Sequence, residues 1–219
     1  MKKGFTLAEV LITLAIIGVV AALTIPTVVN NYQKKAQYTA FMKMYNTITT
    51  ALKLAEAEHG TPNNWTGDTY VARTNNNLVP YFKVASVCEQ SDIENCFSYD
   101  MKTIGGETVP NSIMFAGDSD VSTGIQFLQD GSALMMAISD DGEIDFMFDT
   151  NGTKGPNIAG RDIFWMLYKP DENGKWTFFF DESQDSNQDF RASECDPTNS
   201  SAAGWGCPAR LLQEGKMDY

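Results

Sequence analysis

"MKKGFTLAEVLITLAIIGVVAALTIPTVVN", residues 1–30, combines a short basic start with a long apolar stretch. From Phe5 to Val29 nearly every residue is apolar, and about 20 such residues at ~1.5 Å rise each span the hydrocarbon of a bilayer. Glu9 interrupts this stretch, although an acidic side chain deep in a membrane helix costs about 2.5–3.5 kcal/mol. The carboxylate therefore calls for a function and a partner.

Two ordinary explanations leave Glu9 without a role. A secretory signal peptide fits the basic start and the small residues at 20–22, but apolar character continues beyond them. A plain transmembrane anchor fits the length alone. Cleavage after Gly4 would supply a partner, because Phe5 would become a new N-terminus with a positive amine. That amine could neutralise Glu9 within its own helix or, between packed helices, Glu9 of the next subunit.

The stretch "KKGFTLAEVLITLAIIGVVAALTIP" resembles the N-terminal processing and methylation motif of type IV pilins and type II secretion pseudopilins. In that family a membrane-embedded peptidase cuts after the glycine and methylates the new N-terminal phenylalanine, and the glutamate serves assembly. For this chain the resemblance implies processing at Gly4 and Phe5 and an assembly role for Glu9.

Gly18 and Pro26 are the candidate weak points of this helix. Pro26 removes one backbone hydrogen bond and predicts a kink. Gly18 suits tight helix packing, and with Pro26 it would let the helix loosen, as the resemblance implies.

The helical pattern continues beyond Pro26 to about His59. An apolar stripe at spacings of three or four residues should lie on a sheet of the same subunit, and Gly60 and Pro62 supply the stop. The stripe consists of Ala36, Ala40, Phe41, Met44, Tyr45, Ile48, Ala51, Leu52 and Ala55.

Antiparallel strands are predicted in the second half of the chain. Asp130-Gly131 and Asp141-Gly142 suit tight hairpin turns and separate strands at about 123–129, 132–139 and 143–148. Residues 163–180 read as a further hairpin with its loop at 170–175, and residues 61–111 read as irregular.

The predicted fold class is α+β, with a long N-terminal helix on an antiparallel sheet, which is also the pilin-like fold that the resemblance implies. The predicted divisions are a leader at 1–4, a membrane and assembly helix at 5–29, its amphipathic continuation at 30–59 and an extracytoplasmic domain at 60–219.

Four cysteines fall into two close pairs, Cys88 with Cys96 and Cys195 with Cys207. An even count beyond a membrane segment indicates disulfides outside the cytosol; three connectivities are open, and we favour the two local loops. The absence of a Cys-x-x-Cys pair and the single histidine, His59, argue against zinc.

The sequence gives no sign of an enzyme, because it lacks nucleophile, phosphate-binding and metal-binding His-pair motifs. We expect no cofactor and no metal; calcium at Asp145, Asp149 and Asn151 is the alternative, although the spacing does not complete an EF-hand. The net charge of −12 argues against nucleic acid as a partner.

The resemblance implies a structural subunit of a type IV pilus-like filament. Its partners would be other subunits, the prepilin peptidase and methylase, the inner-membrane assembly platform and the ATPase machinery. Lys2 and Lys3 would stay cytoplasmic, which makes the chain a single-pass protein of the bacterial inner membrane before it enters the filament. A pseudopilin of a type II secretion system and a low-copy minor pilin with a binding tip are the alternatives.

Overall fold

A computed structural model describes residue 4 and residues 6–93, 100–109, 122–180 and 192–219. The chain divides between Ala36 and Gln37 into two compact units. The predicted divisions at 5–29, 30–59 and 60–219 were drawn by the expected role of each segment, whereas these two units are defined by contacts within the chain. The predicted divisions stay a prediction.

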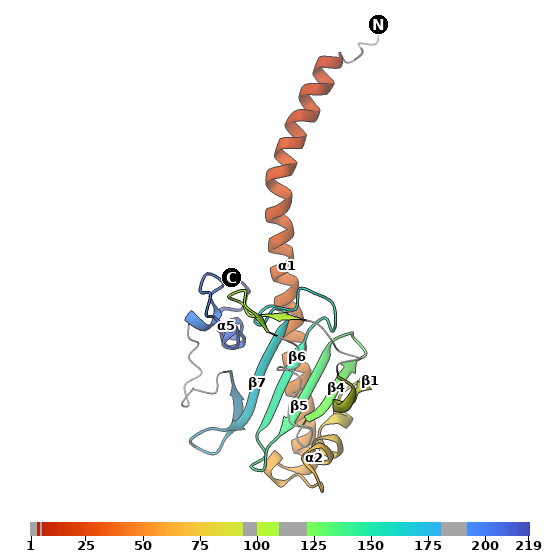
Figure 1. Ribbon diagram of the computed structural model, residues 1–219, viewed down its shortest axis with the longest axis vertical. Coiled ribbons are helices and arrows are strands. Elements are labelled where there is room, and N and C mark those ends of the chain that lie inside the picture. Colours follow the sequence, from red (N-terminus) through yellow and green to blue (C-terminus); the bar gives the residue numbers. More distant parts are fainter. Residues whose placement is uncertain (1–3, 5, 94–99, 110–121, 181–191) are drawn as a thin grey trace. The chain divides into compact units, whose positions relative to one another are not determined.

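Helix α1 (Leu7–His59) contributes to both units and is continuous through Gly18 and Pro26 (Figure 1). It ends where predicted, at Gly60, whose φ of +77° is accessible to glycine and whose N–H donates to the Glu56 carbonyl at 2.9 Å. The buried stripe begins later than predicted, because Ala36 is exposed and Ala40 only half-buried. The fully buried residues of α1 are Phe41, Met44, Ile48, Ala51, Leu52 and Ala55.

The second unit contains a six-stranded antiparallel sheet in the order β1-β4-β5-β6-β7-β8. Its strands are β1 (Val84–Cys88), β4 (Ser122–Leu128), β5 (Ala133–Ile138), β6 (Ile144–Asp149), β7 (Ile163–Pro170) and β8 (Trp176–Phe179). The predicted strands and hairpins are confirmed, with Gly131 at φ +88° and Gly142 at φ +83° in the turns. A second sheet pairs β2 (Met101–Lys102) with β3 (Thr108–Val109).

The segment predicted as irregular contains several regular elements that the sequence pattern does not reveal, helix α2 and strand β1 among them. Helix α2 (Tyr70–Asn77) starts at Thr69, whose side chain accepts a hydrogen bond from the Ala72 N–H at 3.0 Å. Strand β1 forms the edge of the large sheet beside β4. The remaining elements are the 3₁₀ helices η1 (Pro62–Asn64), η2 (Val79–Tyr81), η3 (Gln90–Asp92) and η4 (Ala192–Cys195), and helix α5 (Cys207–Glu214).

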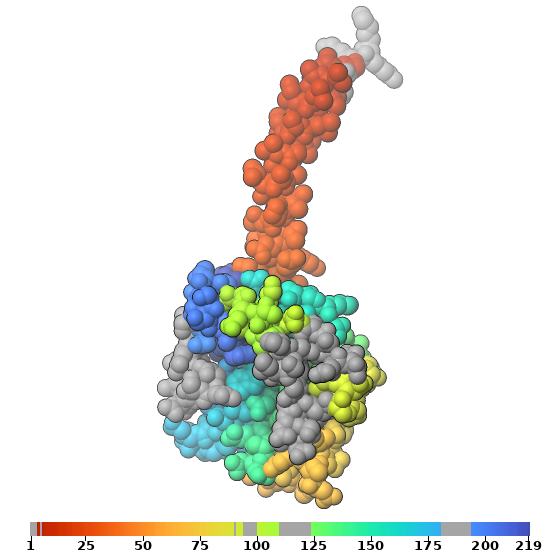
Figure 2. All heavy atoms as spheres, viewed as in Figure 1, coloured from red at the N-terminus to blue at the C-terminus, as the bar shows by residue number. Residues whose placement is uncertain are grey.

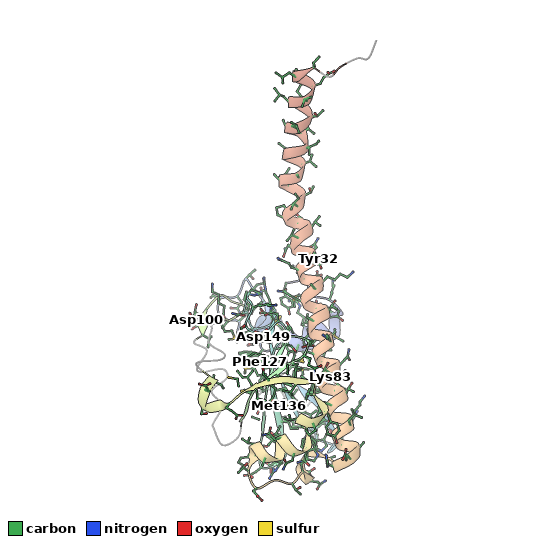
Figure 3. All side chains as sticks on the ribbon, turned by 90° about the vertical axis from the view of Figure 1, so that its right-hand side faces the viewer. Tyr32, Lys83, Asp100, Phe127, Met136 and Asp149 are labelled. Atoms are coloured by element: carbon green, nitrogen blue, oxygen red, sulfur yellow. A yellow bond between two sulfur atoms is a disulfide. The ribbon has the colours of Figure 1, made fainter. Side chains whose placement is uncertain are left out.

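The core of the second unit lies between α1 and one face of the large sheet. Phe41 of α1 meets Phe164 of β7 and Phe148 of β6 with ring centroids 4.7 and 6.2 Å apart. In β4, β5 and β6, even-numbered apolar residues such as Met136 belong to this core, while odd-numbered ones such as Met135 belong to a second cluster on the opposite face. Figure 3 shows Met136 within the domain in a view turned by 90°.

The small β2–β3 sheet joins the second cluster through Met101, which is fully buried. Gly105 lies in the turn between β2 and β3, and its N–H donates a hydrogen bond to the Ala202 carbonyl at 3.0 Å. Figure 2 shows this yellow-green segment on the surface beside the blue C-terminal residues. The C-terminal region thus contacts the small sheet, while its own buried residues, among them Ala202 and Leu211, belong to the core cluster that contains α1.

Candidate functional site

The first turn of α1 holds the candidate assembly residue, Glu9. Thr6 precedes the helix and donates to Glu9 Oε2 from both its backbone N–H and its hydroxyl, each at 2.8 Å. In return, the Glu9 N–H donates to Thr6 Oγ1 at 3.3 Å. This reciprocal pair is a capping box, which satisfies donors that the start of a helix leaves without partners.

The capping box is legible in the sequence as Thr6-x-x-Glu9, the S/T-x-x-E signature, but the prediction based on charge alone missed it. Gly4 and Glu9 lie within the described residues, whereas Phe5, at the predicted cleavage point, lies outside them. The processing role of Gly4 and Phe5 and the assembly role of Glu9 stay predictions.

Helix α1 is long and apolar enough to cross a membrane. Its most apolar window has a mean hydropathy of 2.4, and none of that window is buried within the chain. Such a surface is unfavourable in water and fits a helix anchored in a membrane. The large apolar side chains exposed along it are Leu7, Val10, Leu11, Ile12, Leu14, Ile16, Ile17, Val19, Val20, Leu23, Ile25, Val28 and Val29.

Gly18 lies on this exposed surface, and a Cβ atom at its position would meet nothing within 4 Å. Packing among the described residues therefore leaves room for a side chain at position 18. Pro26 lies inside the continuous helix, where its missing N–H leaves one helical bond unmade. The packing role of Gly18 and the bending role of Pro26 stay predictions.

The predicted C-terminal disulfide is confirmed: Cys195 and Cys207 are bonded to one another across a separation of 12 residues. Cys88 is also disulfide-bonded. Its predicted partner, Cys96, lies outside the described residues. The bonded state of these cysteines agrees with an oxidising environment outside the cytosol.

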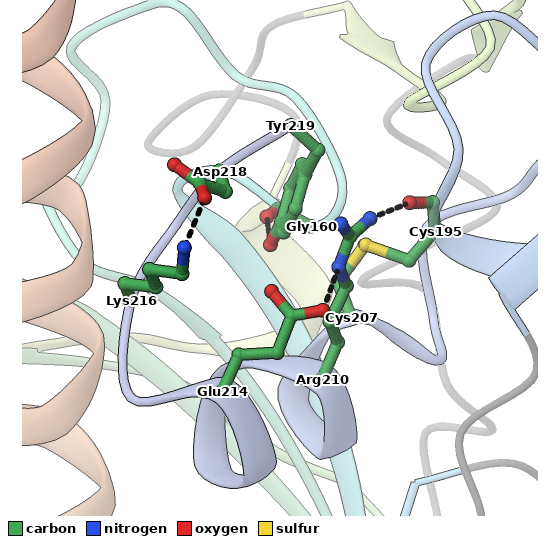
Figure 4. A network of polar contacts seen from close by, with 8 residues as sticks. All are labelled: Gly160, Cys195, Cys207, Arg210, Glu214, Lys216, Asp218 and Tyr219. Atoms are coloured by element: carbon green, nitrogen blue, oxygen red, sulfur yellow. Dashed lines mark hydrogen bonds and ion pairs between the residues drawn. A yellow bond between two sulfur atoms is a disulfide. The ribbon is translucent and has the colours of Figure 1, made fainter.

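A network of polar contacts surrounds the C-terminal disulfide (Figure 4). The Arg210 guanidinium donates to the Cys195 carbonyl at 2.9 Å, pairs with Glu214 at 2.9 Å and stacks over the Tyr219 ring at 4.9 Å. The buried Tyr219 hydroxyl donates to the Gly160 carbonyl at 2.6 Å. Burial raises the pKa of the Tyr219 hydroxyl.

Gly160 adjoins the disulfide itself. Its φ is +82°, and a Cβ atom at its position would lie 2.5 Å from Cys207 Sγ. One glycine thus links the loop after β6, the disulfide and the C-terminal tyrosine. Sequence spacing predicted the disulfide but gave no sign of this contact. Lys216 and Asp218 form an exposed ion pair nearby.

The three residues considered for calcium do not form a single group. Asp145 and Asp149 lie four residues apart on β6, which corresponds to about 13 Å along a strand. Asp145 accepts a hydrogen bond from the Trp165 indole N–H at 3.0 Å, and Asp149 accepts one from the Asn151 N–H at 2.9 Å. Within the described ranges, no group of three or more His, Cys, Asp or Glu side chains could hold a metal ion.

Asp162 is a fully buried carboxyl that no sequence motif marks. Burial raises its pKa, while N–H donors oppose that rise. The Ile158 N–H donates to Oδ1 at 2.7 Å, and the Asn157 N–H and the Asn151 amide donate to Oδ2 at 2.8 and 3.2 Å. Both oxygens of Asp162 accept hydrogen bonds from N–H groups, so this carboxyl stabilises the turn that contains its donors.

An open groove of about 690 Å³ lies between α1 and the turn after β4. Lys43 pairs with Asp130 in it at 2.8 Å. The groove is lined by Lys43, Asn46, Thr47, Thr50, Ala51, Tyr81, Lys83, Leu128, Gln129 and Asp130. These residues include neither a histidine nor a cysteine. The Tyr81 hydroxyl among them donates to Glu58 Oε2 at 2.5 Å and lies 3.2 Å from His59 Nε2.

Comparison with known proteins gives two matches. The model of the prokaryotic N-terminal methylation motif matches residues 1–25. The model of a family of unknown function, DUF6613, matches residues 27–197. No curated protein and no solved structure matches the chain. The motif confirms the type IV pilin-like resemblance, and such proteins are structural rather than enzymatic. The chain therefore belongs to the DUF6613 family and begins with the N-terminal methylation motif of type IV pilin-like proteins.

Proposed function

We propose that this protein is a structural filament subunit that is cut between Gly4 and Phe5, methylated at the new amine and polymerised through its N-terminal helix. The observation that carries the proposal is the first helix: it bears the methylation motif, exposes a membrane-length apolar surface and holds Glu9 in its first turn. An apolar surface that the subunit itself does not cover suits lipid before assembly and neighbouring helices afterwards.

Within this proposal Glu9 pairs with the amine of Phe5 of a neighbouring subunit. A carboxylate in an apolar filament core is heavily penalised unless it meets a cation, so the pair would fix the register of assembly. The partners are other copies of the chain, the peptidase and methylase, the assembly platform and its ATPase. The chain would start as a single-pass inner-membrane protein with the domain at 60–219 outside the cytoplasm.

We further propose that the subunit acts without a cofactor and without enzymatic activity. Asp162, the buried carboxyl beside the loop considered for calcium, accepts hydrogen bonds from N–H groups on both oxygens, and these donors stabilise its charge without a cation.

Substitution of Glu9 tests the proposal in cells that make the filament. Glu9→Ala should leave cleavage intact, because the scissile bond is unchanged, but should abolish filaments recovered by shearing. Glu9→Asp keeps the charge on a shorter side chain and should assemble better than Glu9→Ala. Filaments in normal amount from Glu9→Ala would refute the assembly role of the carboxylate.

A further inference from the structure

The charges along α1 are opposite in sign to the net charge of the chain. The whole sequence has a net charge of −12, yet no aspartate or glutamate occurs between Glu9 and Glu56. The charged residues of this stretch are Lys34, Lys35, Lys43 and Lys53. The helix therefore has a local excess of positive charge on an acidic protein, and its first two lysines follow soon after the exposed apolar surface.

A polar collar, residues 30–35, comes directly after the apolar surface of α1. Its sequence is Asn-Asn-Tyr-Gln-Lys-Lys, and because six helical residues make more than one full turn, polar side chains surround the helix on every side. The apolar stretch before it, residues 7–29, extends about 35 Å, enough to cross about 30 Å of hydrocarbon. The collar adds about 9 Å, which is close to the roughly 5–8 Å of headgroup region on each side of a bilayer. It would therefore lie among lipid headgroups when the apolar stretch spans the hydrocarbon.

The side chains of the collar suit that depth. Tyr32 is 73% exposed on α1 (Figure 3), and tyrosine rings are enriched at membrane–water interfaces. Lys35 is exposed and Lys34 half-buried, and the flexible stem of a lysine lets its ammonium group reach a phosphate. The collar contains no acidic residue that would repel an anionic lipid. Its charge and its continuity with the membrane-length surface both favour anionic headgroups.

We propose that the polar collar binds the phosphate groups of anionic phospholipids on the extracytoplasmic side of the membrane. Lys34 and Lys35 pair with the phosphates, and the Tyr32 ring lies at the boundary between headgroups and hydrocarbon. This inference rests on the proposed function, because it needs the subunit to be inserted in a membrane. It deepens that function by naming the lipid class that holds the subunit before assembly.

Amine labelling of the full chain in lipid nanodiscs tests the contact at the lysines themselves. One copy per disc is embedded in phosphatidylglycerol or in phosphatidylcholine, and the reacted fraction of each lysine is read by mass spectrometry. Lys34 and Lys35 should react about fivefold more slowly in phosphatidylglycerol, the equivalent of one lysine held at an anionic membrane surface. Lys175, exposed in the loop between β7 and β8, is the internal control and should react equally in both lipids.

Two double variants with the same change in charge separate the collar from net charge. Lys34→Gln/Lys35→Gln removes two charges from the collar, whereas Lys53→Gln/Lys175→Gln removes two exposed lysines elsewhere. Each protein is placed in discs of both lipids mixed, and the lipids that stay bound on extraction are counted by native mass spectrometry. The wild type and the Lys53/Lys175 variant should retain phosphatidylglycerol in excess, and the collar variant should retain on the order of tenfold less. The basic leader is the same in all three proteins, so its contribution cancels.

Equal labelling of Lys34 and Lys35 in the two lipids would overturn the inference, and so would equal loss of phosphatidylglycerol from both double variants. Protection that appears in either lipid, and only when a disc holds two or more copies, would identify a second copy as the partner and overturn it as well. These results would leave the proposed function standing, because cleavage and filament recovery are measured separately. A full chain that inserts into neither kind of disc would overturn both.

Discussion

Replacing Tyr219 by phenylalanine removes one oxygen atom from the buried C-terminal end of the domain. Tyr219 is 7% exposed, and its hydroxyl donates to the Gly160 carbonyl at 2.6 Å. The phenylalanine ring keeps the same shape and the stacking with Arg210. The variant therefore isolates the hydrogen bond that ties the C-terminus to the turn beside the disulfide.

The expected loss of stability comes from the buried Gly160 carbonyl, which the substitution leaves without its donor. Gly160 O would keep no hydrogen-bond donor among the described residues, and a buried carbonyl without a partner costs about 1–3 kcal/mol. For a domain of this size, a loss of about 1 kcal/mol lowers the Tm by about 2–4 °C. Tyr219→Phe should thus lower the Tm by between about 2 and 12 °C at neutral pH.

The effect should shrink at alkaline pH. Burial raises the pKa of Tyr219 in the folded state, whereas a tyrosine in the unfolded chain titrates near 10. A raised folded pKa contributes stability that is present below the unfolded pKa and is lost as the pH rises through the folded pKa. As the pH rises above about 10, the wild type should therefore lose stability that the phenylalanine variant cannot lose.

Thermal unfolding followed by circular dichroism, on a soluble fragment that starts at Gln37, measures both effects. Tyr38→Phe is the matched control, because the Tyr38 hydroxyl has no described hydrogen bond; it should leave the free energy of unfolding within about 0.5 kcal/mol. An unchanged Tm for Tyr219→Phe at neutral pH, or a difference from the wild type that does not narrow at alkaline pH, would refute the reasoning.

The other predictions use the same fragment. Replacing Cys195 and Cys207 together by serine opens a loop that closes across 12 residues and should cost about 3 kcal/mol, read from urea unfolding. Phe41→Ala removes a fully buried ring from the contact between α1 and the sheet and should cost about 3–5 kcal/mol. Leu54→Ala, at a residue 51% exposed on the same helix, should cost far less, and equal losses would contradict the assigned core. Millimolar calcium and EDTA should give the same Tm; a rise with calcium would revive the metal site near Asp149.

Much of the fold follows from local rules in the sequence. The hairpins were predictable because Asp130-Gly131 and Asp141-Gly142 place glycine where the turn needs a positive φ. The alternation of buried residues between the two faces follows from the period of two along each strand.

Elements that depend on tertiary contacts were not predictable in this way. Helix α2 has the polar sequence "YVARTNNN", and its start relies on the Thr69 cap rather than on an apolar stripe. Strand β1 exposes Ala85, Ser86 and Val87 in succession, so no alternation marks it, and pairing with β4 defines it.

In the candidate site, too, some features follow from local sequence motifs and others need the structure. Gly4, Phe5 and Glu9 were found because the motif is local, and the Thr6-x-x-Glu9 spacing is local as well. That both Thr6 donors reach a single oxygen of Glu9 requires atomic geometry. Asp162 was missed because its donors come from a turn whose course no periodic pattern describes.

Mass spectrometry of the mature protein, isolated from its cells and digested, shows whether the amine proposed as the partner of Glu9 exists. We predict an N-terminal peptide that begins at Phe5 and carries one methyl group on its amine, with Met1 to Gly4 removed. A mature chain that retains Gly4, or that begins beyond Glu9, would have no cation at the position that filament assembly through Glu9 needs, and it would refute the proposed function.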